Sequence, residues 1–468
     1  MLGRTRRVHF VGIGGIGMSG IAELLANLGY QVSGSDRKRS DVTARLERLG
    51  VRVEEGHDAR HVGEADVVVL SSAVDAANPE IAEAKRRGVP VIPRAEMLAE
   101  LMRLRYGIAV AGAHGKTTTT SMIALVLEQA GLDPTAVIGG RVSAFGSNAR
   151  LGLGEYMVAE ADESDRSFLK LSPSIAVVTN LDREHMEAYG SVENLKQAFV
   201  DFANKVPFYG AVVACADDPM LASLLPRITR RLITYGFGAA ADLVARDVTL
   251  GAFEARCRVS TTLKGRTTSR GAEGLGTLTL KVPGRHNVQN ALAAVAVALE
   301  LDVPFANVAA ALAEFGGAER RFQRLGEAGG AIVVDDYGHH PTEIAAVIAA
   351  ARAGINRRVL VVFQPHRYSR TRDLMDDFGP ALGGADEIVL TDIYAAGEPP
   401  LPGITLESFA ARVQAAAGVP VHAVPALGDL PAFVAGRARP GDLIITLGAG
   451  SIGAVGPKIL AALGKGGG

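Results

Sequence analysis

Residues Val110–Thr119 read VAGAHGKTTT and follow directly from an apolar, strand-like run, Ile108–Ala111. A helical stretch, Met122–Gln129, comes next. This order is typical of a phosphate-binding loop, because glycines let backbone N–H groups turn toward phosphate oxygens and the helix start adds positive potential. In such a loop Lys116 can reach the terminal phosphates, and the Thr117 hydroxyl can bind Mg²⁺. The alternative, a glycine turn with a solvated lysine, is disfavoured by the strand-loop-helix order.

On both sides of this loop, short apolar runs rich in Val and Ile alternate with Ala- and Leu-rich helical stretches. Such alternation is typical of parallel sheets covered by helices, so we predict a doubly wound α/β architecture. The apolar runs expected to form strands are Val8–Ile13, Val67–Leu70, Ile108–Ala111, Ile175–Thr179, Ala331–Val334, Val359–Phe363 and Leu443–Leu447.

A chain of 468 residues is longer than the roughly 250 to 300 residues at which a single core stops growing, so more than one domain is expected. Strand-then-loop signals near Gly12, Gly112 and Asp335 indicate three nucleotide-fold-like units. We predict a Rossmann-like N-terminal domain, a P-loop-type central ATPase domain and a Rossmann-like C-terminal domain. Their predicted limits are residues 1–105, 106–317 and 318–468.

The balance of charges excludes several classes of partner. Lysine plus arginine (49) against aspartate plus glutamate (50) gives a net charge of -1, so nothing favours non-specific binding to nucleic acid or an anionic membrane. No run approaches the roughly 18 apolar residues of a membrane span. Cys215 and Cys257 are too few for a disulfide framework, which suits a reducing compartment. We therefore expect a cytoplasmic protein that binds neither nucleic acid nor membrane.

A second glycine loop, Gly12–Gly20, reads GIGGIGMSG and precedes a helix from Ile21. Asp36 closes the next strand, about 20 residues further on, which completes a dinucleotide fingerprint. By spacing alone, NAD would be the ligand and an oxidoreductase the enzyme. A nucleoside-diphosphate sugar places its pyrophosphate at the same helix end, so the loop indicates a diphosphate more firmly than hydride chemistry. A tight turn without a ligand is the remaining alternative.

Several carboxylates follow an apolar strand of the middle domain, in the segment Val158–Asp165 (VAEADESD). Glu160 is nearest the strand and is best placed to face the phosphate loop, where Mg²⁺ needs hard oxygen ligands. Asp165 is expected in a solvated acidic turn. His185 comes after the next strand and can join the same centre, although a lone histidine on a surface loop is usually just solvated.

Two asparagines, Asn287 and Asn290, precede the helical stretch Ala291–Leu299. Three residues apart, they would share one helical face, where their amides can read an adenine edge. Either residue can equally act as a helix cap, and the sequence leaves both roles open.

In the last domain, two polar loops follow two strands that are successive along the chain. One is rich in histidine, Asp335–Glu343 (DDYGHHPTE), and the other in arginine, Gln364–Arg372 (QPHRYSRTR). Loops at the carboxyl ends of strands form the crevice in which α/β sheets bind ligands. Arg367 and Arg370 can hold a carboxylate or a phosphate, and the histidines can orient polar groups.

With these residues in view, the chain resembles the Mur ligase family from Val8 to Ile452. The family's phosphate loop has the same shortened form, in which Val110 takes the place of the first glycine. Glu184 stands before the metal histidine where many relatives have Asp. The segments that occur in the order of the family are Gly12–Gly20, Gly112–Thr118, Glu160–Ser164, Gly284–Asn290, Asp336–Glu343 and Gln364–Arg370.

The resemblance implies a set of site residues in each domain. For the UDP-sugar they are Gly14, Gly15, Ile16, Gly17, Met18, Ser19, Asp36, Ser71 and Ser72. For ATP they are Gly112, Ala113, His114, Gly115, Lys116, Thr117, Thr118, Asn287, Asn290 and Arg320. For the amino acid they are Tyr337, His339, His366, Arg367 and Arg370. For Mg²⁺ they are Thr117, Glu160 and His185, and the catalytic roles would go to Lys116, Glu160, His185, His339 and Arg370.

By the same resemblance, the chain would use ATP and Mg²⁺ to join L-alanine to the lactyl carboxylate of UDP-N-acetylmuramate through an acyl phosphate, as a monomer or weak homodimer. A sister ligase that adds another amino acid or a recycled peptide is a close alternative, and a non-catalytic nucleotide-binding module is a more distant one. A methyl group is worth only about 1 to 3 kcal/mol in a pocket, so selectivity among alanine, glycine and serine stays open.

Overall fold

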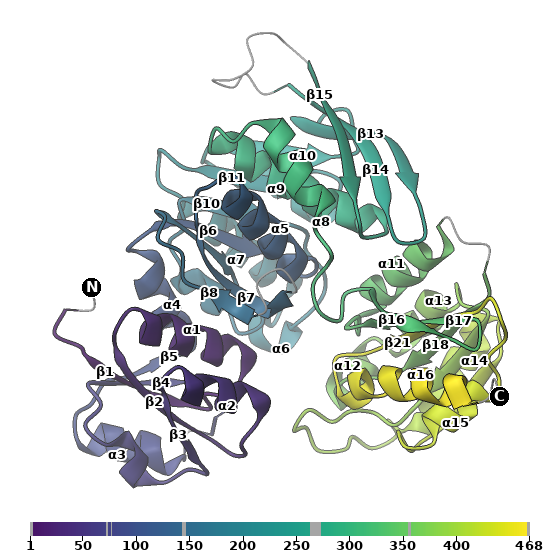
Figure 1. Cartoon of the computed structure of the whole chain (residues 1–468), viewed down its shortest axis with the longest axis horizontal. Coiled ribbons are helices and arrows are strands. Elements are labelled where there is room, and N and C mark those ends of the chain that lie inside the picture. Colours follow the sequence, from purple (N-terminus) through teal and green to yellow (C-terminus); the bar gives the residue numbers. More distant parts are fainter. Residues whose placement is uncertain are drawn as a thin grey trace. The chain divides into compact units, whose positions relative to one another are not determined.

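A computed structural model describes residues 3–71, 74–75, 77–142, 147–262, 273–353 and 357–465 of the chain. Over these residues the strands form three sheets, and each sheet is built from one consecutive part of the chain (Figure 1). Helices follow most of the strands, as the alternating sequence pattern predicts. The expected three-domain α/β fold is confirmed.

The N-terminal sheet has the order β3-β2-β1-β4-β5, and its paired strands are parallel. Its strands are β1 (Arg7–Val11), β2 (Gln31–Asp36), β3 (Arg52–Glu55), β4 (Val67–Leu70) and β5 (Val91–Pro93). Its helices are α1 (Ile16–Asn27), α2 (Asp41–Arg48), α3 (Pro79–Arg86) and α4 (Arg94–Met102). β1 ends before the expected Ile13, because Gly12 turns the chain with a φ of 81°. β1 pairs with β2 on one side and with β4 on the other, so the strand order reverses at β1. Ligands of such sheets bind beside the strand at which the order reverses.

The central sheet has the order β15-β14-β13-β12-β11-β10-β6-β9-β7-β8. Its middle strand β6 pairs in parallel with both β10 and β9, so the loops after these three strands meet at one edge. The strands are β6 (Tyr106–Ala111), β7 (Thr135–Val142), β8 (Ser147–Arg150), β9 (Tyr156–Glu160), β10 (Ile175–Val178), β11 (Ala211–Cys215), β12 (Leu232–Gly236), β13 (Leu243–Leu250), β14 (Ala255–Thr261) and β15 (Glu273–Leu280). The helices are α5 (Lys116–Gln129), α6 (Met186–Tyr189), α7 (Val192–Asn204), α8 (Pro219–Ala222), α9 (Arg285–Glu300) and α10 (Phe305–Ala313).

α5 begins at Lys116, earlier than the expected Met122. The polar run after the lysine does not read as a helix face, yet these side chains are buried. The hydroxyl of Thr120 donates to the Lys116 carbonyl at 2.8 Å, and that of Ser121 donates to the Thr117 carbonyl at 2.7 Å. These bonds along the helix let the hydroxyls be buried without losing their partners.

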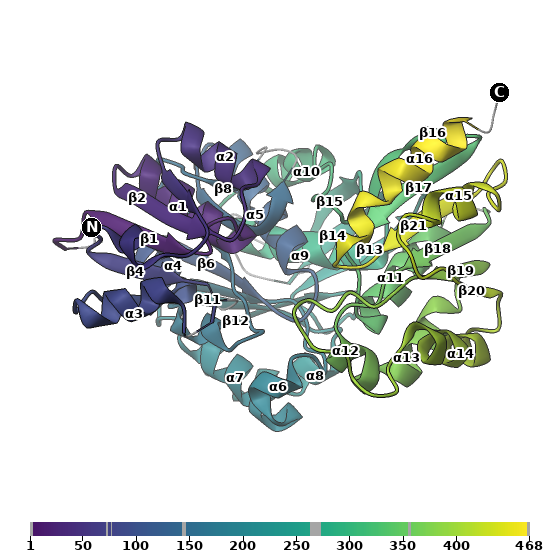
Figure 2. The same cartoon turned by 90° about the horizontal axis from the view of Figure 1, so that it is seen from below.

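The C-terminal sheet has the order β16-β17-β21-β18-β19-β20. Two apolar clusters show that α11, α13 and α14 cover one face of it, and α15 and α16 the other (Figure 2). The strands are β16 (Gln323–Ala328), β17 (Ala331–Asp336), β18 (Val359–Phe363), β19 (Glu387–Leu390), β20 (Val421–Ala423) and β21 (Leu443–Leu447). The helices are α11 (Pro341–Arg352), α12 (Tyr368–Asp373), α13 (Met375–Leu382), α14 (Leu406–Ala417), α15 (Leu430–Ala435) and α16 (Gly456–Lys465).

The chain packs into two compact units. The first comprises Met1–Arg246, Arg258–Leu278 and Gln289–Phe315, and thus the N-terminal sheet with most of the central sheet. The second comprises Asp247–Cys257, Thr279–Val288 and Gly316–Gly468. None of the helices in the described ranges combines the length and the apolarity that crossing a bilayer requires.

Candidate active site

The glycine-lysine loop lies after β6 and closes tightly on the neighbouring segment that follows β10. Gly112 has a φ of 137°, and a Cβ there would collide with the Thr179 hydroxyl. Gly115 has a φ of 81°, and a Cβ there would lie 2.5 Å from Asn290 Oδ1. At both positions, then, a side chain is disfavoured by the positive φ and would also collide with a neighbouring residue, so both require glycine.

Asn180 fixes the loop from the next strand, and nothing in the sequence pattern singled it out. Its side chain accepts the His114 N–H at 2.8 Å and donates to the His114 carbonyl at 3.0 Å, while its own carbonyl accepts the Ala113 N–H at 3.1 Å. The Thr179 hydroxyl also donates to the His114 carbonyl, at 2.6 Å. The loop is thus held in shape from β10 before any nucleotide arrives.

Lys116 is folded back over its own loop. Its Nζ donates to the carbonyls of Gly112 (2.6 Å) and Ala113 (2.9 Å) and pairs with Glu163 Oε1 at 2.8 Å. Burial opposes the charge, but the carboxylates of Glu163 and Glu160 outweigh it and raise the pKa of Lys116 above its usual range. The lysine therefore carries its proton at neutral pH and can meet phosphate oxygens as a cation.

Glu163 is a site residue that the sequence argument passed over in favour of Glu160. It is 3% exposed, and burial raises its pKa to about 7, with a further rise from Asp162 and an opposing effect from Lys116. In the described part of the chain, its Oε2 has no hydrogen-bond partner. Its only signal was its place in the acidic segment, and its contact with Lys116 depends on how two loops far apart in sequence pack.

Thr117 and Glu160 form an oxygen pair beside the lysine. The Thr117 hydroxyl donates to Glu160 Oε2 at 2.9 Å, and the same oxygen accepts the Gly139 N–H at 2.8 Å. A hydroxyl and a carboxylate are hard oxygen donors of the kind that Mg²⁺ prefers, so these residues fit the expected ion. His185 caps the short helix α6, and its ring nitrogens lie 3.7 Å from Glu184 Oε1 and 3.8 Å from Glu187 Oε1.

Of the other residues expected at ATP, some lie at the glycine loop and one caps its own helix. His114 Nε2 lies 2.8 Å from Asp182 Oδ2, and Thr118 is buried in the first turn of α5. Asn290 sits against Gly115, whereas the Asn287 amide donates to the Pro283 carbonyl at 2.7 Å in the manner of a local cap.

Between these two asparagines, Gln289 ties α9 to the end of β11. Its amide donates to Asp217 Oδ2 at 2.9 Å. The same carboxylate accepts the N–H groups of Phe237 (2.8 Å) and Gly238 (3.2 Å). Gln289 and Asp217 thus hold the start of α9 at the ligand edge of the central sheet, and neither was predicted.

The glycine loop of the N-terminal sheet is bonded to the end of β2. The Ser35 carbonyl accepts the N–H groups of Gly12 (2.8 Å) and Ile13 (3.0 Å), and Asp36 Oδ2 accepts that of Gly14 at 2.7 Å. The N–H groups that follow lie in the first turn of α1, where a helix offers them no internal partner. A diphosphate would therefore meet the start of α1, at Ile16 and Gly17.

The other residues expected at the UDP-sugar are Gly15, Met18, Ser19, Ser71 and Ser72. Gly15 precedes α1 as its N-cap, and Met18 and Ser19 are buried in the helix. Ser71 follows β4, and its Cβ would lie 3.3 Å from a Cβ on Gly12. Ser72 lies outside the described residues.

Arg94 is a further residue of this loop that the sequence argument missed. It opens α4 directly after β5, and its guanidinium carbon would lie 3.1 Å from a Cβ on Gly17. Its Nη2 pairs with Asp162 Oδ2 in the acidic segment of the central domain at 3.0 Å. A fixed cation thus stands beside the start of α1, where an anion is already favoured.

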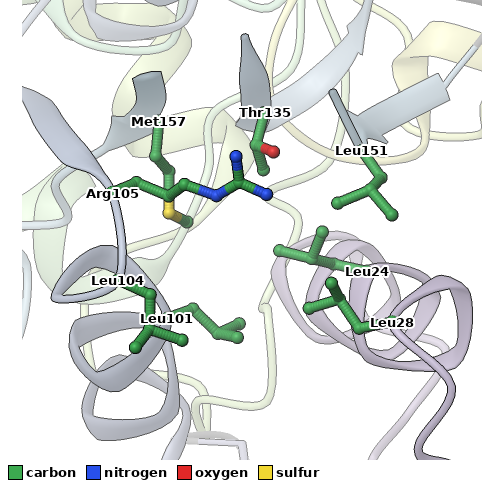
Figure 3. Close-up of a pocket in the computed structure, with 8 residues that line it drawn as sticks. All are labelled: Leu24, Leu28, Leu101, Leu104, Arg105, Thr135, Leu151 and Met157. Atoms are coloured by element: carbon green, nitrogen blue, oxygen red, sulfur yellow. The ribbon is translucent and has the colours of Figure 1, made fainter. Parts of the chain in front are cut away.

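A pocket lies behind α1, away from both glycine loops. Figure 3 shows Leu24 and Leu28 of α1 facing Leu151 and the Arg105 side chain. The remaining lining residues are Leu101, Leu104, Thr135 and Met157. This largely apolar seam packs α1 against the central sheet and contains none of the residues expected at a ligand.

At the C-terminal sheet, aromatic rings from both predicted loops lie in a row, with edge, tilted and stacked contacts in turn. The rings of Tyr337 and His339 are 5.5 Å apart, those of His339 and His366 are 5.5 Å apart, and His366 stacks on Tyr394 at 5.5 Å. The two loops therefore meet at the same edge of the sheet, although β21 lies between β17 and β18. Tyr394 lies after β19 and was not predicted.

Arg370 determines the tautomer of His366. Its Nη1 lies 3.1 Å from His366 Nδ1 and 3.4 Å from the His366 carbonyl. Because a guanidinium can only donate, Nδ1 must be the acceptor, and a neutral His366 carries its proton on Nε2. Arg367 points to Glu398, whose Oε1 lies 3.9 Å from its Nη1.

Arg320 is engaged within the C-terminal unit. Its Nε donates to Asp335 Oδ2 at 2.8 Å, its Nη2 donates to the Gly448 carbonyl at 2.6 Å, and its guanidinium carbon lies 5.2 Å from the centre of the Tyr337 ring. Arg321 lies at 5.2 Å from the same ring. Both arginines also pair with carboxylates, Arg320 with Asp335 and Arg321 with Glu343 at 3.6 Å, so their charges are balanced locally.

Asp336 precedes Tyr337 and is fully enclosed. Its carboxylate accepts the N–H groups of Phe322 (2.7 Å) and Gly338 (2.6 Å). Burial raises its pKa to about 6, against the opposing charge of Arg321 and these two bonds. Because this pKa exceeds the ordinary 3.8, the folded state binds the proton of Asp336 more tightly than the unfolded state does. The stability that the protonated carboxyl group contributes is therefore lost as pH rises from 3.8 to about 6.

We therefore expect the melting temperature of the unmodified chain to fall relative to that of Asp336→Asn as pH rises from 3.8 to about 6. Thermal melts of both proteins across this range measure the difference. Melting temperatures that stay parallel would show that Asp336 does not titrate there.

Comparison with family models finds three matches in chain order. Residues 7–106 match "Mur ligase family, catalytic domain", residues 110–298 match "Mur ligase middle domain", and residues 320–450 match "Mur ligase, glutamate ligase domain". Together they span most of the chain.

Individual proteins match along the whole length. The chain is 54% identical to a UDP-N-acetylmuramate--L-alanine ligase from Anaeromyxobacter sp. (strain Fw109-5) and 55% identical to one from Geobacter sp. (strain M21), with 98% of each chain covered. A solved UDP-N-acetylmuramate-alanine ligase from Thermotoga maritima superposes with a TM-score of 0.80 at 30% identity, covering 97% of this chain and 98% of that one. A murein peptide ligase from Psychrobacter arcticus gives a TM-score of 0.71 at 25% identity, covering 98% and 99%.

Proposed function

Since the chain belongs to the Mur ligase family, we propose that it uses ATP to join L-alanine to the lactyl carboxylate of UDP-N-acetylmuramate, a step of peptidoglycan precursor synthesis. The observation that carries this proposal within the structure is the cluster of Lys116, Thr117, Glu160 and Glu163 around one glycine loop. A cation, a hydroxyl and carboxylates around one glycine loop are the groups that binding of a triphosphate with Mg²⁺ requires, which supports the proposal.

A carboxylate does not react with an amine at a useful rate, so it must first be activated. We propose that the γ-phosphoryl group of ATP is transferred to a lactyl carboxylate oxygen, which gives an acyl phosphate and ADP. The amine of alanine then attacks the carbonyl carbon, phosphate leaves with the shared oxygen, and the amine loses a proton. The products are the amide, ADP and phosphate.

Lys116 has the central part in the first step. A phosphate oxygen would take the place of the Glu163 carboxylate at Nζ, and the ammonium group would then stabilise the charge on the transferring phosphoryl group. Thr117 and Glu160 would hold Mg²⁺, with His185 contributing directly or through water. When bound, the ion would neutralise phosphate charge.

The proposed site of the amino acid is the row of Tyr337, His339 and His366 together with Arg370. Arg370 and Arg367 would bind the alanine carboxylate, because guanidinium groups match the geometry of a carboxylate. Arg320 would support ATP phosphates, which requires that it exchange one of its present partners.

The oxidoreductase alternative rested on Gly12–Gly17 and Asp36. It leaves the Lys116 cluster without a purpose, and the Asp36 carboxylate is already bonded to the Gly14 N–H. Because the chain belongs to the Mur ligase family, the spacing of the first glycine loop is no longer a reason to prefer an oxidoreductase. The non-catalytic alternative loses support for a similar reason, because Lys116, Thr117 and Glu160 are all in place.

The purified protein with UDP-N-acetylmuramate, ATP and each amino acid in turn tests the proposed function. Release of phosphate should require both the sugar acid and an amino acid, and alanine should give the highest kcat/KM. Phosphate release with a preformed peptide but not with single amino acids would instead identify a peptide-recycling sister ligase.

Replacing Arg94 with alanine should raise the KM for UDP-N-acetylmuramate about 10-fold, since a hydrogen bond to a charged group contributes about 1.5 to 3 kcal/mol. The KM for ATP should change less. Steady-state kinetics with each substrate varied separately measures both. An equal rise in both KM values would show that Arg94 only holds the domains together through Asp162.

We also propose the domain limits, the compartment and the oligomeric state. The domain limits are residues 1–105, 106–317 and 318–468, since each of the three sheets falls within one of these ranges. The enzyme would work in the cytoplasm, where ATP and nucleotide sugars are made, as a monomer or weak homodimer.

A further inference from the structure

A buried carboxylate stands at the centre of the N-terminal domain, and the mechanism above does not use it. Glu80, in the first turn of α3, has no exposed surface. Its Oε2 lies 2.6 Å from His9 Nε2 on β1, and its Oε1 lies 2.7 Å from the Ser35 hydroxyl on β2 and 2.8 Å from His57 Nδ1 after β3. Two strands and the segment that follows β3 are thus joined to one helix by a single side chain.

The charge of Glu80 decides the direction of the hydrogen bonds that it makes, and the Ser35 hydroxyl also lies 3.1 Å from His57 Nδ1. An ionised carboxylate only accepts, so His9 Nε2, His57 Nδ1 and the Ser35 hydroxyl must each donate to it. His9 Nδ1 lies 2.9 Å from the Ser33 hydroxyl. Burial opposes the charge of Glu80, but the hydrogen bonds from His9, Ser35 and His57 outweigh it and lower the pKa of Glu80.

The network ends at the glycine loop. Ser35, whose side chain bonds to Glu80, is the residue whose carbonyl accepts the N–H groups of Gly12 (2.8 Å) and Ile13 (3.0 Å). Asp36, the next residue, accepts the N–H of Gly14 at 2.7 Å. The position of the β2 end therefore sets the position of the loop that opens α1.

We propose that Glu80 is a positioning residue of the UDP-sugar site, which fixes the end of β2 through Ser35 and His57 and so holds the loop Gly12–Gly14 in the shape that receives the diphosphate. The proposal rests on the proposed function for the identity of the ligand. Glu80 touches no substrate, and its effect passes through the backbone of the loop.

The test is Glu80→Gln, which keeps the shape of the side chain. The amide replaces one acceptor oxygen by a donor NH2 group, so one of the three donors must lose its bond or exchange its role. We expect the KM for UDP-N-acetylmuramate to rise about 10-fold or more, because small displacements at a binding loop have large effects. The kcat at saturating sugar and the KM for ATP should stay within about 2-fold.

Ser35→Ala is the second variant, in case Glu80→Gln does not fold. It keeps the carbonyl that holds the loop and removes one bond to Glu80, so it should shift the same KM in the same direction by less. The matched control is Glu387→Gln. Glu387 is also buried and is paired with Arg358 and Arg437, but it opens β19 in the C-terminal sheet.

Glu387→Gln should lower the melting temperature without a specific change in the KM for the sugar. The proposal would be overturned if Glu80→Gln left the KM for the sugar unchanged. It would also be overturned if kcat fell and both KM values rose by similar factors. If the unmodified protein releases no phosphate with UDP-N-acetylmuramate and alanine, the proposed function fails instead, so the two failures are distinguishable.

Discussion

Lys116→Ala is expected to lower kcat for amide formation about 1,000-fold, the usual cost of removing one preorganised group that stabilises charge in a phosphoryl transfer. The reason lies in the loop geometry. Lys116 Nζ is the cation that lies over the carbonyls of Gly112 and Ala113, beside the oxygens of Thr117 and Glu160. Single-turnover measurement of ADP formation separates this loss from slow product release.

Lys196→Ala is the matched control, because Lys196 is a lysine of the same unit that pairs with Glu193 along α7 at 2.9 Å, away from the glycine loop in sequence. It should leave kcat unchanged. A Lys116→Ala protein that keeps more than about a tenth of the original kcat would remove the lysine from the centre of the mechanism.

Glu160→Gln is expected to lower kcat about 100-fold and to weaken Mg²⁺ binding in the presence of a non-hydrolysable ATP analogue by a similar factor. The amide can still accept from the Thr117 hydroxyl or the Gly139 N–H, so the loops should stay in place while the charge is lost. Titration with Mg²⁺ followed by calorimetry measures the second effect independently of activity.

The control for this change is Glu128→Gln at the far end of α5, where Glu128 pairs with Arg150 at 3.2 Å near the surface. Its Mg²⁺ titration should match that of the unmodified protein. If Glu160→Gln bound Mg²⁺ as tightly as the control, Glu160 would not be a ligand, and Glu163 would become the next carboxylate to examine.

Strand positions were well predicted from local sequence, because buried parallel strands are short continuous apolar runs. Val67–Leu70, Val359–Phe363 and Leu443–Leu447 coincide with β4, β18 and β21. Helix α5 was placed too late, because its first turns carry threonines and a serine whose burial depends on bonds to helix carbonyls. A hydrophobic pattern cannot show such bonds.

The glycine loops could be predicted because their chemistry is contained in a few consecutive residues. Asn180, Glu163, Arg94 and Tyr394 could not, because each acts across a distance in sequence that only the sheet order closes. Asn180, for example, meets His114 because β10 pairs with β6. Arg94 meets Gly17 because β5 ends on the same side of its sheet as β1.

The buried network of Glu80 escaped prediction for the same reason. His9, Ser35, His57 and Glu80 lie in different elements, and each reads alone as an ordinary polar residue. A glutamate at the second position of a helix is commonly explained by the helix dipole. Its contacts with β1, β2 and the segment after β3 show a different role.

The most direct measurement of the central claim follows an oxygen atom. UDP-N-acetylmuramate labelled with oxygen-18 in its lactyl carboxylate is converted with ATP and L-alanine, and the released phosphate is analysed by mass spectrometry. If the phosphoryl group held at Lys116 is passed to the sugar acid, each phosphate carries one labelled oxygen. Phosphate without the label would show that the carboxylate is never phosphorylated, and the account would be wrong.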